Sequence, residues 1–122
     1  MKPIPTEAQE QAWLMAWAKG NEARHPELKL LYHVPNGGSR NKIEAANLKR
    51  QGVKSGVPDL CLPVARGRYH SLYVEMKRRE RSRITQTQKE WLQELHKYGN
   101  LVVVCYGAEE AKAAILEYLK GD

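Results

Sequence analysis

Apolar and polar residues follow two periodicities along the chain, and these predict helices and strands. Good helix formers with apolar residues three or four apart predict helices over 6–19, 41–52, 85–99 and 108–122. Short apolar runs bounded by turn residues predict strands over 28–34, 59–65, 71–77 and 100–107. Thr6 and Asn41 stand at helix N-cap positions, and Gly52 and Gly99 stand where two of the helices are expected to stop.

The order of these elements predicts the fold class. The strand over 100–107 follows the strand over 71–77 through a helix, so these two strands are expected to lie parallel in one sheet. Its unbroken apolar run predicts burial on both faces. With a hairpin formed by 59–65 and 71–77, the pattern describes an α/β domain with a mixed central β-sheet flanked by helices. The length of 122 residues predicts a single domain over 1–122.

The predicted hairpin brings three charged residues together at one end of the sheet. Side chains alternate between the two faces of a strand, so Glu75 and Lys77 share one face of theirs. If the hairpin is centred on Gly67, Asp59 lies directly opposite Glu75, with β-carbons roughly 5 Å apart. Two carboxylates at this separation repel each other unless a cation lies between them.

The spacing alone leaves two interpretations of these charges open. In the first, Asp59 and Glu75 share a divalent cation such as Mg²⁺ or Mn²⁺, and Lys77 reaches a phosphate or a metal-bound water. In the second, all three lie at a solvated strand end. Asp59 then caps the turn after Pro58, and Lys77 simply pairs with Glu75.

The charge of the chain favours a polyanionic partner. Lys and Arg number 20 against 14 Asp and Glu, which leaves a formal net charge of +6. Residues 77–83, KRRERSR, hold five of these basic groups beside the charged strand end. No apolar run approaches the roughly 18 residues of a membrane span. Cys61 and Cys105 lie in apolar strands without Cys or His nearby, which predicts buried free thiols, a reducing compartment and no zinc site.

Several stretches around the hairpin resemble one nuclease family. PD at 58–59 and EMK at 75–77 match the loose PD-(D/E)xK signature, and three more specific stretches accompany it: HVPNGG, LKRQGVKSGVPDL and TQTQKEWLQELHKYG. Together they resemble the VRR-NUC nucleases over nearly the whole chain, especially small stand-alone bacterial and viral members similar to Holliday-junction resolvases. The resemblance implies a restriction-endonuclease-like core, DNA cleavage with Mg²⁺ or Mn²⁺, a homodimer and an intracellular location.

The resemblance also implies roles for the residues of the hairpin. Asp59 and Glu75 are expected to bind the metal together with the backbone carbonyl of Met76. Lys77 is expected to orient or activate the attacking water, and the products keep a 5′-phosphate.

Two further family positions lie on helices. The family carries a glutamate on its first helix, where both Glu7 and Glu10 are available. Glu7 is preferred because Gln11, four residues later, shares its helix face as the family pattern requires. An acidic first turn that suits the helix dipole is the alternative for either residue. The family's glutamine after the lysine matches Gln88, whose alternative is a capping box with Thr85; both roles are compatible.

Basic and turn residues near the site predict contacts with DNA. The stretch HVPNGGSR can wrap a phosphate through its adjacent glycines, with Asn36 and Arg40 as donors, or it is an ordinary loop. The run after Lys77 is expected to hold the DNA backbone through Arg78, Arg79, Arg81 and Arg83, with a solvated loop as the alternative. For His33 we favour a packed histidine over a contact with the scissile phosphate.

Taken together, these features predict a metal-dependent endonuclease that resolves four-way DNA junctions as a homodimer. One alternative is a monomeric nuclease for flaps or single-strand junctions. Another is a DNA-binding module without catalysis, against which the intact Asp59, Glu75 and Lys77 argue.

Overall fold

The computed structural model describes residues 3–35, 41–80 and 83–121. The helices of this part are α1 (Glu7–Gly20), α2 (Lys42–Arg50), α3 (Gln86–Lys97) and α4 (Ala108–Leu119), with a short 3₁₀ turn, η1 (Pro26–Leu30). The strands are β1 (Tyr32–His33), β2 (Leu60–Leu62), β3 (Leu72–Lys77) and β4 (Leu101–Tyr106). No helix in the described ranges is long and apolar enough to cross a membrane.

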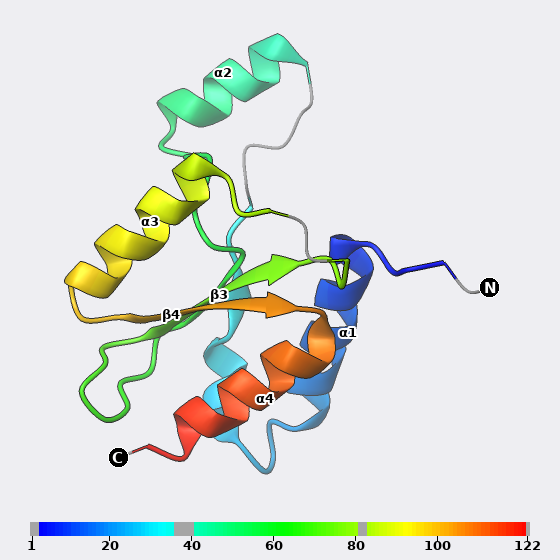
Figure 1. Ribbon diagram of the computed structural model, residues 1–122, viewed down its shortest axis with the longest axis vertical. Helices are drawn as coiled ribbons and strands as arrows, with labels where there is room; N and C mark the ends of the chain where they lie inside the picture. Colours follow the sequence, from blue (N-terminus) through cyan, green and yellow to red (C-terminus); the bar gives the residue numbers. More distant parts are fainter. Residues whose placement is uncertain (1–2, 36–40, 81–82, 122) are drawn as a thin grey trace.

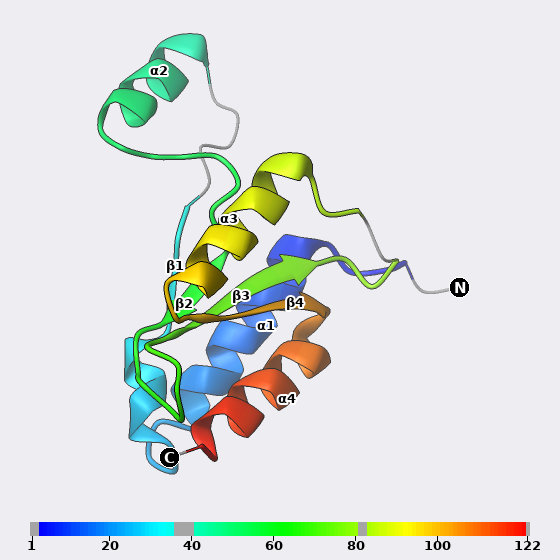
Figure 2. The same ribbon diagram turned by 60° about the vertical axis from the view of Figure 1, so that its left-hand side comes forward.

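The strands form one mixed sheet in the order β1-β2-β3-β4. The β1–β2 and β2–β3 pairs are antiparallel, and the β3–β4 pair is parallel across the α3 crossover. The predicted α/β class and mixed sheet are therefore confirmed. Helices α1 and α4 pack together on one face, and α3 lies on the other (Figures 1 and 2).

The core lies between the sheet and the α1–α4 pair. Leu72, Val74 and Met76 point into it from alternate positions of β3, and each is at most 1% exposed. Leu14 of α1 and Ile115 of α4 meet them from the helical side, both fully buried. Burial of such side chains contributes about 1.5–3 kcal/mol each, so this layer fixes β3 and the residues at its end.

The hairpin register was predicted correctly, although the turn differs from the predicted one. Leu60 pairs with Val74 and Leu62 with Leu72, so the next step places Asp59 opposite Glu75. The tip is a two-residue turn between Arg66 and Tyr69, not a turn centred on Gly67. The pairing is offset by one residue between the Arg66–Tyr69 bridge at the tip and the β2–β3 pairs, and this offset restores the predicted register.

Two strand predictions were wrong in part. The segment 28–34 forms η1 and the two-residue β1, because Leu28 and Leu31 are both buried at the spacing of a helical turn. Strand β2, with which β1 pairs, is itself only three residues long, so the pairing of β1 extends over two residues. The strand β4 is at the sheet edge and mostly half-buried, so its predicted burial on both faces was also wrong.

Candidate active site

Asp59 and Glu75 meet at the end of the sheet. Asp59 directly precedes β2, and its Oδ2 accepts a hydrogen bond of 2.7 Å from the Met76 backbone N–H. Glu75 lies on β3 and is only 1% exposed. Burial raises the pKa of Asp59, against the opposing effect of the Met76 N–H. The structure therefore places the two carboxylates side by side, as the hairpin register predicted, with Glu75 buried and Asp59 half-buried.

Glu75 is held by one hydrogen bond and leaves one oxygen without a donor. Its Oε2 accepts a bond of 3.0 Å from Nε2 of Gln88, while the buried Oε1 has no hydrogen-bond partner among the described residues. Burial, followed by the charge of Asp59, raises the pKa of Glu75 to about 8. A buried carboxylate oxygen without a hydrogen-bond partner, in a pair of neighbouring carboxylates, is a ligand that a cation can bind.

Lys77 supplies a positive charge beside this pair. It is the last residue of β3, is 6% exposed, and shares a strand face with Glu75. Its charge lowers the pKa of both Glu75 and Asp59, although burial outweighs this effect at each carboxyl. Lys77 is therefore a buried cation within electrostatic reach of both carboxylates, and the solvated strand end does not describe these residues.

Glu7 and Glu10, the two candidates for the helix glutamate of the family, have different environments in the first turn of α1. Glu7 is exposed and lines a hollow of about 280 Å³ together with Ala8, Gln11, His33, Asp59 and Met76. Glu10 is fully buried, and its carboxylate accepts bonds from Arg79 Nε at 2.5 Å and from the Ala108 N–H at 3.1 Å. Burial opposes ionisation of Glu10, yet these donors keep its pKa below the usual value. Glu7 thus faces the site, and Glu10 joins α1 to the start of α4.

We expect Glu10→Ala to lower the free energy of unfolding by about 1–3 kcal/mol, because the buried Ala108 N–H loses its acceptor. Urea unfolding followed by circular dichroism measures this. The matched control is Glu7→Ala, which removes an exposed carboxylate and should change stability little while weakening Mn²⁺ binding. Equal destabilisation by both changes contradicts this division of roles.

The donors at this end of the sheet fit a divalent cation only in part. A buried Glu75 with an unsatisfied oxygen and a half-buried Asp59 beside it are the hard ligands that Mg²⁺ and Mn²⁺ prefer. In residues 3–35, 41–80 and 83–121, however, no three His, Cys, Asp or Glu side chains converge closely enough to hold a metal. Glu7 lies at the rim of the hollow, so Asp59 and Glu75 form the centre of the candidate metal site.

Gln88 serves two partners with one amide. Its side-chain Oε1 accepts a hydrogen bond from the Thr85 backbone N–H at 3.0 Å. The Gln88 backbone N–H donates to the Thr85 hydroxyl at 3.1 Å, which completes the predicted capping box. Its Nε2 donates to Glu75. The cap therefore fixes the amide that orients the Glu75 carboxylate, and the two predicted geometries coexist.

His33 was predicted to be a packed residue, and this was wrong. It is exposed on β1, lines the hollow with Glu7 and Asp59, and its Nδ1 lies 2.9 Å from the backbone oxygen of Asp59. Since a carbonyl only accepts, the ring nitrogen at this contact carries the hydrogen. The signal in the sequence was the position of His33 at a strand end just before Pro35.

The arginines predicted to bind DNA have different environments. Arg78 donates to the backbone oxygens of Ile4 and Pro5 at 2.7 and 3.1 Å, and Arg79 pairs with Glu10. Both guanidinium groups thus hold the start of the chain and α1 against the end of β3. Arg83 is exposed. The remaining predicted contacts lie outside the described residues: Asn36, Arg40 and Arg81.

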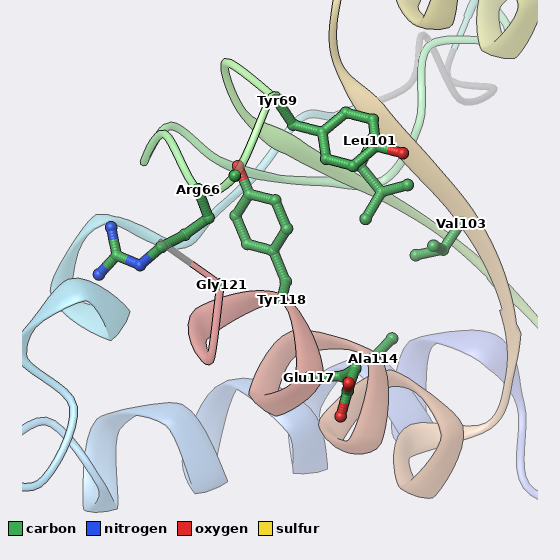
Figure 3. Close-up of a pocket in the computed structure, with 9 residues that line it drawn as sticks. Arg66, Tyr69, Leu101, Val103, Ala114, Glu117, Tyr118 and Gly121 are labelled. Atoms are coloured by element: carbon green, nitrogen blue, oxygen red, sulfur yellow. The ribbon is translucent and has the colours of Figure 1, made fainter.

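A second hollow, of about 320 Å³, opens between β4, α4 and the hairpin tip (Figure 3). Tyr69, Leu101, Val103 and Tyr118 make most of its lining apolar. The Arg66 guanidinium is turned away from it, toward Glu27 and the Leu119 carbonyl. Tyr118 Oη donates to the Val64 backbone oxygen. Without converging polar groups, this hollow offers no catalytic chemistry.

Comparison with known proteins agrees with the geometry of the acidic site. The VRR-NUC domain family matches residues 5–109. A solved structure named VRR_NUC domain protein has a TM-score of 0.82 and 35% sequence identity, and the match covers 97% of this chain and 91% of that one. No curated protein matches the chain. The chain therefore belongs to the VRR-NUC domain family and is a nuclease domain with a restriction-endonuclease-like α/β core.

Proposed function

We propose that this nuclease domain is a Mg²⁺- or Mn²⁺-dependent endodeoxyribonuclease that cuts branched DNA, with four-way junctions as its preferred substrate. The observation that carries the proposal is the buried Glu75 carboxylate, whose Oε1 has no hydrogen-bond partner and which lies beside the half-buried Asp59 and the buried Lys77. A protein without a metal-dependent reaction gains nothing from this arrangement, because two facing carboxylates destabilise the fold. This is also the argument against an inactive DNA-binding module.

Each residue of the site has a separate role in the proposed reaction. Asp59 and Glu75 would hold the cation, with Glu7 and the Met76 carbonyl as further ligands. When bound at these residues, the cation would supply a water of lowered pKa and would neutralise charge on the phosphoryl oxygens. Gln88 keeps the Glu75 carboxylate oriented through its 3.0 Å bond. Lys77 holds the attacking water in line with the P–O3′ bond, whose cleavage leaves a 3′-hydroxyl on one product and a 5′-phosphate on the other.

Resolution of a four-way junction needs two active sites that face paired strands. A two-fold homodimer supplies such a pair, because its interface repeats each site by symmetry. The similarity to stand-alone VRR-NUC nucleases supports this assembly over a monomeric nuclease for flaps. A particle mass in solution of twice the 14.0 kDa of one chain is the expected result of sedimentation.

We expect cleavage of labelled four-way junctions with Mg²⁺ or Mn²⁺ and none with EDTA. Flap and linear duplex substrates of the same length serve as comparisons, and Mn²⁺ titration calorimetry reads metal binding independently of activity. Asp59→Ala should abolish both metal binding and cleavage. Cleavage in EDTA contradicts the metal-dependent reaction, whereas faster cutting of flaps than junctions by a monomer supports the alternative substrate.

A further inference from the structure

Helix α2 stands away from the rest of the domain. Among the described residues it makes no packing contact with any other helix or strand, and it contains no buried residue (Figures 1 and 2). Its nine residues are fewer than the roughly 12–15 that an isolated helix needs in water. The Asn41 cap, which accepts from the Glu44 N–H at 2.7 Å, offsets only part of this deficit. A partner that contacts α2 would therefore stabilise it.

Three basic residues lie on one side of α2, beside the exposed Ile43. At 100° per residue, Lys42, Lys49 and Arg50 fall within one arc of the helix, and all three are exposed. The half-buried Ala45 and Leu48 line a small hollow of about 200 Å³ together with Lys49 and the loop that follows. Ala45 and Leu48 are thus turned toward their own loop, while Lys42, Lys49 and Arg50 remain exposed.

The charge on this segment is a large share of the total. Residues 42–54 contain four basic residues and one acidic residue, which makes +3 of the formal net charge of +6. Two copies of such a face repel each other, whereas a phosphate backbone attracts it. Charge therefore favours a polyanion over a second copy of this chain as the occupant.

The loop that follows α2 connects this helix to the candidate active site. The loop from α2 to β2 passes Gly56, where an added Cβ would lie 2.5 Å from the Thr87 side chain at the start of α3. Gln88, the next residue of α3, contacts Glu75. The same loop then leads directly to Asp59. DNA held in the site can therefore continue along α2.

We propose that the face formed by Lys42, Lys49 and Arg50 is a second DNA contact, an arm that binds the phosphate backbone beside the cleavage site. Lys42 and Lys49 are about 10.5 Å apart along the helix axis, close to three phosphate steps of one strand at about 3.4 Å each. The contact involves no base edges, so it adds affinity without sequence preference. This proposal depends on DNA being the substrate, as proposed above, but it does not depend on the cleavage reaction.

The test measures DNA binding in EDTA, where cleavage plays no part. The triple variant Lys42→Gln, Lys49→Gln, Arg50→Gln is compared with a charge-matched control, Lys19→Gln, Lys97→Gln, Lys120→Gln, whose residues lie at the far ends of α1, α3 and α4. We expect the α2 variant to lower duplex affinity about tenfold or more and to reduce the slope of log affinity against log salt by about two to three. The control should change both far less.

Hydrogen exchange locates the contact directly. Adding duplex DNA to the wild-type protein should slow amide exchange within 42–50. Equal slopes of log affinity against log salt for the two triple variants, or amide exchange in α2 that DNA leaves unchanged, contradict the proposed DNA-binding arm. So does a change of particle mass in the α2 variant, which would assign the face to contact between copies. Binding through α2 without any cleavage in Mg²⁺ would leave the arm intact and contradict only the proposed reaction.

Discussion

Replacing Lys77 with methionine is expected to lower the rate constant for metal-dependent DNA cleavage by about 10²–10⁴-fold. The buried lysine holds the attacking water in the proposed reaction, and methionine keeps its aliphatic stem in the same space. Single-turnover cleavage of a labelled junction measures the chemical step. Mn²⁺ affinity should not weaken, because the variant removes a positive charge from beside the two carboxylates.

The matched control for this experiment is Lys89→Met. Lys89 is an exposed lysine on α3, one residue beyond Gln88, so its replacement tests the loss of a nearby surface charge. We expect the control to cleave at nearly the wild-type rate. Full activity in Lys77→Met, with an unchanged fold by circular dichroism, excludes the proposed role of this residue.

Replacing Glu75 with glutamine is expected to stabilise the metal-free protein while it abolishes Mn²⁺ binding and cleavage. The pKa of Glu75 rises from 4.5 to about 8 on folding. Between these values the folded state keeps a proton that the unfolded chain has lost, so wild-type stability falls as pH rises through this window. Glutamine stays neutral, and the advantage of the variant is therefore largest above about pH 8.

Thermal unfolding in EDTA at several pH values measures this difference. About 1 kcal/mol moves the Tm of a domain of this size by roughly 3–6 °C, so a shift of several degrees is readily seen. Saturating Mn²⁺ should reverse the order, because only the wild type binds it. A variant that is less stable than the wild type at high pH without metal contradicts the strained carboxylate pair.

The centre of the site was predictable from the sequence because strand periodicity and hairpin register are local. Opposing Asp59 to Glu75 required only alternation along two strands and a turn near Gly67. The capping box at Thr85 and Gln88 was equally local, since its partners are three residues apart. The contact between Gln88 and Glu75 itself follows from the packing of α3 on the sheet.

Features that depend on long-range packing were not predictable. Glu7 and Glu10 both lie in the first turn of α1, and only the approach of Arg79 and α4 buries Glu10. Arg78 was expected to bind DNA, yet the backbone oxygens that it contacts lie more than 70 residues earlier. His33 is exposed because β1 is a short edge strand, which the apolar run around it did not indicate.

The shared amide of Gln88 makes the first turn of α3 and the proposed metal ligand Glu75 one cooperative unit. If that turn frays, Thr85 loses its cap and Glu75 loses its only described hydrogen-bond donor in the same event. Local unfolding of one helix end thus removes the hydrogen bond that orients Glu75, while the core between the sheet and helices α1 and α4 stays folded. The local stability of the first turn of α3, and not the global stability of the domain, therefore limits how long the proposed site stays intact.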